Sequence, residues 1–414
     1  MTTHENYLLA KSIYHKYGVD VDQAIEQLRH IPISIQCWQG DDVKGFYSEA
    51  ALSGGISVTG NYPYRARTIA ELRNDLEQVF KLVPFKHRVN LHAIYLDTKE
   101  KIGLDEIEPK HFETWVNWAI KQGIGLDFNP TLFSHPMSSS GFTLSSQNEH
   151  IRQFWVRHVK QSRKIASYFG EALNNPAVCN LWIPDGYKDT PYSRLSPRVQ
   201  LQKSLDDIYE QSLPSIKDTL ESKLFGIGAE SYTTGSHEFY MGYAVKHQLG
   251  LCLDTGHFHP TEQVGDKLSA IGLFVNHMLL HVSRPVRWDS DHVVSLNDDL
   301  QGVAEALVRD DLLKQTSIGL DYFDASINRI AAWVIGIRNS QKALLKALLE
   351  PKELLKKIEQ EQNYTVRLAY LEELKALPFG LVYDYICEIE HKPVGIEFLK
   401  EIESYEANMK GKRP

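Results

Sequence analysis

The stretch "LGLCLDTGHFHP", residues 249–260, decides the fold class. Its first part is nearly continuous in apolar residues, as in a strand that is buried on both faces of a parallel sheet. The run ends in Asp254, and His257 follows three residues later across a glycine. Buried strands with reactive side chains at their carboxyl ends are typical of α/β barrels, whose active sites lie at that end.

The same pattern occurs eight times along the chain. The other apolar runs cover residues 31–42, 89–97, 123–130, 179–186, 220–230, 273–284 and 317–326. Between them lie amphipathic helical stretches, of which the clearest are 68–83, 150–173, 195–213 and 296–313. Strands that alternate with helices predict a parallel sheet. Eight such units predict an α/β protein with the (β/α)8 TIM-barrel fold.

Helical segments flank the predicted barrel on both sides. Residues 1–30 form a helical lead-in, so the barrel unit is predicted to cover residues 1–326. Residues 327–350 and 353–377 are long amphipathic stretches within an additional helical C-terminal region, 327–414. This region is expected to pack on the barrel or on a neighbouring subunit, which favours an oligomer. The glycine-rich loop 39–68 is predicted to be an insertion beside the active site or a mobile lid.

Composition limits the classes of partner and the compartment. The formal net charge is −8, which disfavours nucleic acid and anionic membranes as partners. We expect no secretory leader and no membrane span, because no apolar run is long enough. The four cysteines have no CxxC spacing, which favours a reducing compartment and predicts a cytoplasmic protein; they are Cys37, Cys179, Cys252 and Cys387.

Strands five to eight each end in side chains that can bind metal. In chain order these residues are Glu221 and Lys223, then Asp254 and His257, then His281 with the loop pair Asp289 and Asp291, then Asp321 and Asp324. In a barrel these ends converge on one mouth, where so many carboxylates would repel each other unless cations were present. Mixed oxygen and imidazole ligands suit Mn²⁺, Co²⁺, Zn²⁺ or Mg²⁺, and there are enough for two ions.

Each of these features also has a purely structural explanation. An aspartate at a strand end often caps the next helix, and an Asp-x-Asp pair often forms a turn. A Glu-x-Lys pair is commonly a surface ion pair, and a core histidine is commonly just hydrogen-bonded. The recurrence of ligand types on four consecutive strands favours the metal interpretation.

Long motifs in this chain resemble the bacterial L-rhamnose isomerase family. They include "CWQGDDV", "NLHAIYL", "GLDFNP", "WIPDGYKD", "ESKLFGIGAESYT", "LCLDTGHFHPTE", "LLHVSRPVRWDSDHVV" and "GLDYFDASINRIAAWVIG". The resemblance covers nearly the whole chain, including the C-terminal region. It implies a cytoplasmic, homotetrameric (β/α)8 barrel, related to xylose isomerase, that interconverts L-rhamnose and L-rhamnulose in rhamnose catabolism with a divalent metal, typically Mn²⁺.

The resemblance also implies roles for individual residues. Glu221, Asp254, His281 and Asp321 would hold the more buried metal, although the motif "GLDYFD" leaves Asp321 and Asp324 as alternatives. The catalytic metal would be held by His257, Asp289 and Asp291, and Asp254 could bridge the two ions. Arg284 and Arg287 are expected to fix the loop that carries the aspartates, together with Trp288.

An aldose–ketose isomerisation moves one hydrogen between C1 and C2. The hydrogen can move as a hydride, which the resemblance favours, or as a proton through an enediol, which needs a carboxylate base. The predicted catalytic residues are Lys223, Asp321 and His92, and the predicted sugar-binding residues are Trp38, Trp182 and Asp185. The structural alternatives are an ion pair with Glu221 for Lys223, a helix cap for Asp185, and core packing for the histidine and tryptophans.

Three other functions compete with this one. Other divalent-metal barrels include further sugar isomerases or epimerases and phosphodiesterases of the endonuclease type. The acidic balance argues against an endonuclease, which needs a basic groove for DNA. A sugar-binding protein without catalysis would not need so many clustered carboxylates.

Overall fold

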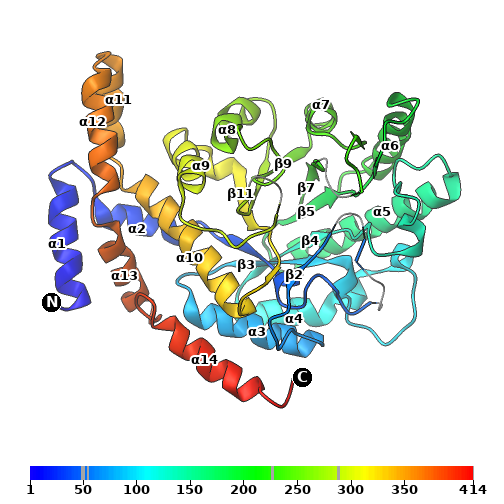
Figure 1. The fold of residues 1–414 in the computed structure, drawn as a ribbon, viewed down its shortest axis with the longest axis horizontal. Helices are drawn as coiled ribbons and strands as arrows, with labels where there is room; N and C mark the ends of the chain where they lie inside the picture. Colours follow the sequence, from blue (N-terminus) through cyan, green and yellow to red (C-terminus); the bar gives the residue numbers. More distant parts are fainter. Residues whose placement is uncertain (48–51, 54–55, 225–227, 287–289, 414) are drawn as a thin grey trace.

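Eight parallel strands close into a barrel in the computed structural model, which describes residues 1–47, 52–53, 56–224, 228–286 and 290–413 (Figure 1). The strands are β1 (Ile33–Gln36), β3 (Arg88–His92), β4 (Gly125–Asn129), β5 (Ala177–Trp182), β7 (Ile216–Glu221), β9 (Gly250–Asp254), β10 (Met278–Val282) and β11 (Thr316–Leu320). Each strand pairs with the next one in the chain, and β11 pairs with β1 to close the ring. The predicted (β/α)8 barrel is confirmed.

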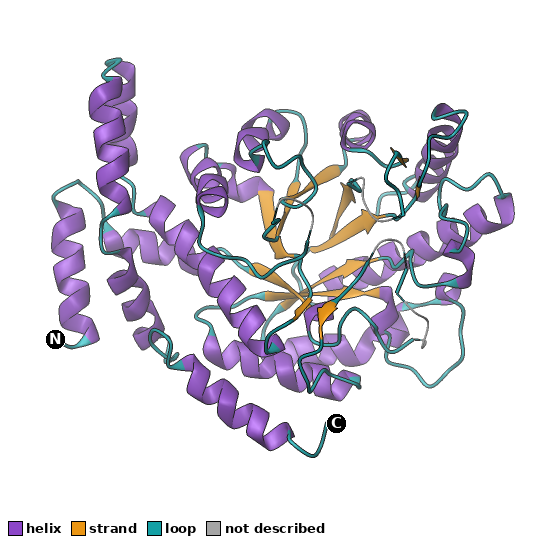
Figure 2. Cartoon of the chain, viewed as in Figure 1, coloured by secondary structure: helices purple, strands orange, loops and turns teal. Residues whose placement is uncertain are grey.

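One barrel helix follows each strand and covers the outside of the sheet (Figure 2). These helices are α3 (Ile69–Leu82), α4 (Glu113–Gln122), α5 (Glu149–Ala172), α6 (Leu195–Ile208), α7 (His237–His247), α8 (Val264–Gly272), α9 (Asp298–Arg309) and α10 (Arg329–Leu348). Several begin where a threonine or asparagine side chain accepts a hydrogen bond from the first turn, as Thr68, Asn148, Asn297 and Asn328 do. Such caps satisfy amide groups that have no partner within the helix.

Short elements complete the loops around the barrel. Two small sheets pair β2 (Thr59–Gly60) with β12 (Asp324–Ala325) and β6 (Gly186–Tyr187) with β8 (Tyr232–Thr233). Single 3-10 turns lie at Cys37–Gln39, Ala93–Tyr95, Leu104–Glu106, Pro109–Phe112, Pro136–Ser138 and Leu312–Gln315. The β2–β12 pair joins the loop after the first barrel strand to the end of the eighth.

The predicted helical segments at both ends of the chain are present. The chain begins with α1 (Thr3–His15) and α2 (Val21–Arg29) and ends with α11 (Lys352–Gln360), α12 (Tyr364–Lys375), α13 (Phe379–Ile389) and α14 (Phe398–Met409). The stretch 353–377 is two helices lying side by side (Figure 1), because Gln362 has a left-handed φ of 56° and Asn363 caps a new helix. The boundary predicted after residue 326 stays a prediction; α10, which follows it, packs against α9 and α3.

The interior of the barrel is polar at both ends. At the amino-terminal end, Arg88 donates two hydrogen bonds to the buried carboxylate of Asp127, at 2.7 and 2.9 Å. At the carboxyl end lie the residues of the candidate site. None of the helices in the described ranges is both long and apolar enough to span a membrane.

A buried histidine next to the site should make folding stability depend on pH. The imidazole of His158 is fully buried between the carbonyl of Leu104, at 2.7 Å, and the amide of Thr131, at 3.0 Å. Burial lowers the pKa of His158 from 6.5 to about 4. Between these values the unfolded chain binds a proton that the folded chain excludes. Acidification through this window should therefore destabilise the fold.

We expect His158 to contribute a loss of about 1.4 kcal/mol in the free energy of unfolding for each pH unit below pH 6.5, until about pH 4. Denaturant unfolding of the wild-type protein and of His158→Gln between pH 7 and pH 5 measures this. The variant should show a shallower dependence, and identical slopes would contradict the prediction.

Candidate active site

Four of the predicted metal ligands lie together at the carboxyl end of the barrel. Glu221 and Asp254 are the last residues of β7 and β9, His281 is the penultimate residue of β10, and Asp321 directly follows β11. The register sets His281 opposite Asp254, and sheet closure brings the four strand ends to one mouth. One ligand atom from each residue lies within 4.8 Å of all the others. The four side chains can therefore reach a common metal ion.

The centre of this cluster is the ring of His281. Its Nδ1 lies 3.1 Å from Asp321 Oδ2, 3.2 Å from Glu221 Oε2 and 3.9 Å from Asp254 Oδ2. Neither ring nitrogen of His281 makes a hydrogen bond of acceptable geometry to any described residue, although the side chain is fully buried. A buried polar atom without a hydrogen bond is costly. Donor atoms that converge without pairing fit a cation between them.

The electrostatics of the cluster also fit a cation. Burial lowers the pKa of His281, but its electrostatic interactions with Cys252, Glu221 and Asp321 outweigh burial and raise the pKa well above its usual value. A histidine that binds metal must be neutral. A divalent cation among these carboxylates would neutralise the negative field that otherwise favours the protonated ring.

Neighbouring groups fix the orientation of the ligands. The Asn180 side-chain amide donates to Glu221 Oε2, the Gly256 amide to Asp254 Oδ1 at 2.6 Å, and the Trp38 indole to Asp321 Oδ1 at 3.1 Å. Hydrogen bonds of this kind hold metal ligands in one rotamer. Asn180 is not among the site residues predicted from the sequence. Strand alternation could have found it, because it shares the face of Trp182 two residues on.

Asp321 and Asp324, the two alternative metal ligands after the eighth strand, have different environments. Asp321 lies with Glu221, Asp254 and His281 in the cluster that could hold a metal ion. The carboxylate of Asp324 instead accepts hydrogen bonds from the amide and hydroxyl of Ser326, at 2.8 and 2.5 Å. Its backbone pairs with the side-chain amide of Gln39. The geometry favours Asp321 as the ligand and gives Asp324 a structural role in the β12 turn.

The predicted second metal site is only partly described. His257 borders the cluster, with Nδ1 3.5 Å from Glu221 Oε1. Asp291 lies in the loop after β10 and has a left-handed backbone conformation, with φ 47°. Asp289 lies outside the described residues, as do Arg287 and Trp288. A site made by His257, Asp289 and Asp291 therefore stays a prediction.

Arg284 fixes the base of the loop that carries Asp291. Its backbone amide donates to the carbonyl of His292 at 3.2 Å, and its guanidinium Nε donates to the carbonyl of Val293 at 3.0 Å. The predicted loop-holding contacts of Arg284 thus go to backbone carbonyls.

Aromatic rings line the neighbouring strand ends. The rings of Trp38 and His92 meet edge to face with centroids 4.7 Å apart, His92 meets Phe133 at 5.6 Å, and Phe133 meets Trp182 at 6.1 Å. The Nζ of Lys223 lies 4.9 Å from the centroid of Trp182. The four rings form an aromatic wall, and Lys223 places one cation beside it. Phe133, which follows the third strand end in "NPTLF", is not among the residues predicted from the sequence.

His92 is neutral in this wall. Burial lowers its pKa to about 3. Its Nδ1 lies 3.1 Å from the hydroxyl of Thr131, and its Nε2 lies 3.5 Å from the Asn129 side-chain amide. A neutral imidazole can exchange hydrogen bonds with sugar hydroxyls without carrying charge.

Asp185 is placed differently from the other predicted sugar-binding residues. Its fully buried carboxylate accepts four hydrogen bonds from the backbone amides and hydroxyls of Thr143 and Ser145, at 2.5 to 3.0 Å. Burial raises its pKa in spite of these donors. Asp185 ties the 143–145 segment to the end of β5, and its predicted contact with sugar stays a prediction.

A cluster of potential metal ligands beside an aromatic wall and a lysine suits the chemistry of a sugar carbonyl, and comparison with known proteins defines the family. The family model "L-rhamnose isomerase (RhaA)" matches residues 1–413. The chain belongs to the L-rhamnose isomerase family.

Curated members of the L-rhamnose isomerase family match over almost the full length of the chain. The L-rhamnose isomerase of Listeria monocytogenes serotype 4a is 55% identical over 412 residues, which cover 99% of this chain and 98% of that protein. The L-rhamnose isomerase of Escherichia coli O7:K1 is 56% identical over 401 residues, or 96% of each chain. Family membership thus extends through the helical C-terminal region.

Solved structures of the same general type are much more distant. A xylose isomerase domain protein from Alicyclobacillus acidocaldarius aligns with a TM-score of 0.48 at 12% identity, covering 77% of this chain and 99% of that one. The barrel assignment follows from the strand order, independently of this likeness.

Proposed function

We propose that this enzyme interconverts L-rhamnose and L-rhamnulose by moving a hydrogen between C1 and C2. The observation that carries the proposal is the cluster of Glu221, Asp254, His281 and Asp321 at the barrel mouth, in a chain 55% identical to relatives named L-rhamnose isomerase. Activity assays with a panel of aldoses, L-rhamnose first, test it. Conversion of other aldoses but not of L-rhamnose would favour a different sugar isomerase.

We propose Mn²⁺ as the metal, with Zn²⁺, Co²⁺ and Mg²⁺ as alternatives. Glu221, Asp254, His281 and Asp321 would hold one ion, and the second would be held by His257, Asp289, Asp291 and a bridging Asp254. A divalent ion bound there would polarise the sugar carbonyl and lower the pKa of the adjacent hydroxyl. The mixed carboxylate and imidazole donor set supports this choice.

The other residues would bind and orient the sugar. Lys223 would donate to a sugar oxygen and stabilise charge that develops there. The neutral, buried imidazole of His92 would hydrogen-bond a sugar hydroxyl or assist ring opening. Trp38, Trp182 and Phe133 would pack on the apolar C–H face of the sugar and on its methyl group. Asp185 would act through the segment it holds, or accept a sugar hydroxyl directly.

The hydrogen would move directly from carbon to carbon as a hydride. The enediol route needs a carboxylate or imidazole base near C1 or C2. The low pKa of His92 makes it a poor base, and Asp321 is engaged by the Trp38 indole and the metal cluster.

The route can be tested by running the reaction in D₂O. We expect almost no solvent deuterium at C1 or C2 of the product, measured by NMR or mass spectrometry. Incorporation approaching one deuterium per turnover would replace the hydride route with an enediol.

We further propose a homotetramer that acts in the cytoplasm in rhamnose catabolism. The α11–α12 hairpin extends away from the barrel (Figure 1) and exposes Tyr364 and Leu368, and α1 exposes Leu8 and Leu9. Exposed apolar side chains of this kind favour contacts between subunits. Light scattering should give four times the chain mass, and a monomer would contradict the proposal.

A further inference from the structure

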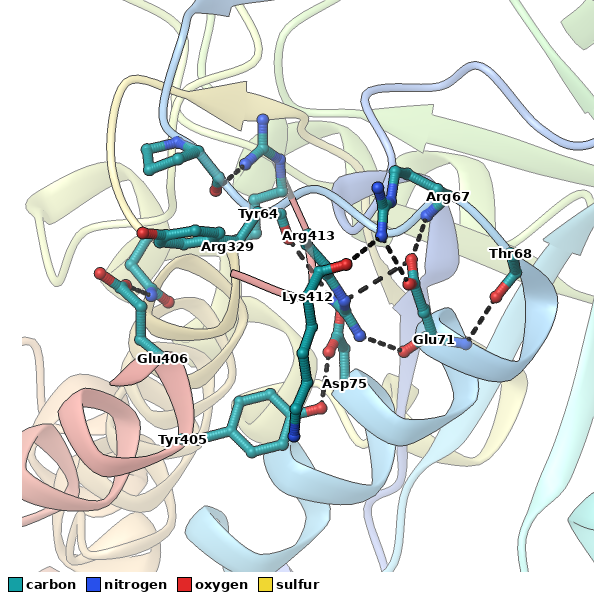
Figure 3. Close-up of polar contacts among 12 residues, drawn as sticks. Tyr64, Arg67, Thr68, Glu71, Asp75, Arg329, Tyr405, Glu406, Lys412 and Arg413 are labelled. Carbon is teal, nitrogen blue, oxygen red and sulfur yellow. Dashed lines mark hydrogen bonds and ion pairs between the residues drawn. The ribbon is translucent and has the colours of Figure 1, made fainter. Parts of the chain in front are cut away.

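Residues near the C-terminus contact the segment between β2 and α3, and β2 pairs with β12 at the barrel mouth. The return segment is residues 59–68, which include β2 and lead to α3. The residues that contact it or its neighbours form the C-terminal clasp: Asn328, Arg329, Tyr405, Glu406, Lys412 and Arg413. Figure 3 shows Arg329, Tyr405, Glu406, Lys412 and Arg413 of the clasp near Tyr64, Arg67, Glu71 and Asp75. Arg67 Nη2 donates to the carbonyl of Lys412 at 2.6 Å, so the chain end lies directly on the return segment.

Arg413 is the centre of the clasp. Its side chain is buried, and its guanidinium lies 2.7 Å from Asp75 Oδ2 and 3.5 Å from Glu71 Oε2. It also donates to the carbonyl of Tyr64 at 3.3 Å. The hydroxyl of Tyr405 donates to the other oxygen of Asp75 at 2.8 Å. A buried guanidinium needs partners for its charge, and Asp75, Glu71 and Tyr64 supply them to Arg413.

The other half of the clasp holds both ends of the long loop after β1. Glu406 accepts hydrogen bonds from the Tyr62 hydroxyl, at 2.8 Å, and from the Asn328 amide, at 2.5 Å. Arg329 donates to both oxygens of Asp42, at 2.8 and 2.9 Å, and to the carbonyl of Tyr62 at 2.7 Å. Asp42, near the start of this loop, and Tyr62 of the return segment are therefore both held by residues at the start of α10 and in α14.

The return segment in turn contacts the eighth strand end. Tyr62 donates to the carbonyl of Ala325 at 2.8 Å, and β2 pairs with β12 with Gly60 opposite Ala325. Gly60 has φ 110°, and a Cβ there would lie 2.3 Å from the Ala325 carbonyl, so only glycine allows this approach. Four residues before Ala325 is Asp321, which receives the indole hydrogen bond of Trp38.

We propose that Arg413 is a positioning residue for the active site. By tying Tyr64 of the return segment to Glu71 and Asp75 of α3, it holds the end of β11 and the Trp38–Asp321 pair in the arrangement that binds the sugar. This role rests on the proposed isomerase function. Among the described residues, the polar contacts of Arg413 are with Tyr64, Glu71 and Asp75, so its effect on catalysis is indirect.

The first test is steady-state kinetics of Arg413→Ala at saturating Mn²⁺. We expect KM for L-rhamnose to rise about fivefold while kcat stays within about twofold. The reason is that a less firmly held Trp38 would bind the substrate and the transition state more weakly by the same amount. Arg413→Lys, which can still pair with Asp75, should recover part of the change. Lys412→Ala is the matched control, since it removes a neighbouring charge but keeps the carbonyl that Arg67 binds.

Hydrogen exchange supplies a readout without turnover. Amides of residues 59–68 should exchange faster in Arg413→Ala than in the wild type or Lys412→Ala. Tyr62→Phe removes only the hydroxyl bound by Glu406 and should raise KM in the same direction. The two changes should combine less than additively, because they loosen the same segment.

The outcomes separate this inference from the proposed function. Wild-type protein without isomerase activity would refute the function and this role with it. An active wild type with unchanged KM and exchange in Arg413→Ala would refute the role alone. A lower kcat with unchanged KM would also overturn it, since that pattern reports only a smaller folded fraction.

Discussion

Glu221→Gln should lower kcat/KM for L-rhamnose by about 10³-fold or more, measured with added Mn²⁺. Glu221 is the carboxylate that contacts both histidines of the centre, at 3.2 Å from His281 and 3.5 Å from His257. Glutamine keeps the size of the side chain but removes one negative charge. It also leaves one oxygen acceptor in place of two, and the Asn180 amide already donates to one oxygen of Glu221.

The same variant should fold normally without metal. Removing one of several buried carboxylates relieves their mutual repulsion, so the metal-free variant should be at least as stable to denaturant as the metal-free wild type. Glu353→Gln, at a highly exposed position on α11, is the control and should change neither property. Activity within tenfold of the wild type would remove Glu221 from the metal site.

Lys223→Met should lower kcat by about 10²-fold, with a much smaller change in KM. Lys223 lies two residues beyond Glu221, and its ammonium group sits 4.9 Å from the centroid of Trp182 in the aromatic wall. A cation held there would stabilise charge on a sugar oxygen mainly in the transition state. Methionine keeps most of the apolar contact with Trp182 and removes the charge.

A structural role for Lys223 as the ion-pair partner of Glu221 predicts a different result. In that case the substitution would weaken Mn²⁺ binding and leave kcat at saturating metal nearly unchanged. Lys217→Met provides the control at the opposite end of the same strand, where burial lowers the pKa of the lysine. It should leave kcat within about twofold.

The barrel was predictable because its strands carry a strong local signal. Strands buried on both faces must be apolar over their whole length, and the reactive residues must then follow at the carboxyl ends. Asp254, His281 and Glu221 could therefore be placed at one mouth from the sequence, and the structure brings them together.

Other features depend on contacts that the sequence does not show. The choice between Asp321 and Asp324 depends on the turn at Ser326, since both aspartates follow the same strand. Asn180 and Phe133 carry no motif of their own and become significant only beside Glu221 and Trp182.

Long-range contacts were the least predictable. The break at Gln362 splits a stretch that is amphipathic throughout, because a single left-handed residue has little effect on hydrophobic periodicity. The contact between Asp75 and Arg413 joins residues 338 positions apart, and neither position shows a pattern that pairs them.

Equilibrium dialysis of Mn²⁺ against the wild-type protein and Glu221→Gln tests the central claim most directly. We expect the wild-type chain to bind at least one Mn²⁺ tightly and the variant to lose that ion at the same free concentration. Equal binding by the two proteins, or no binding by the wild type, would contradict a metal centre built on Glu221, Asp254, His281 and Asp321.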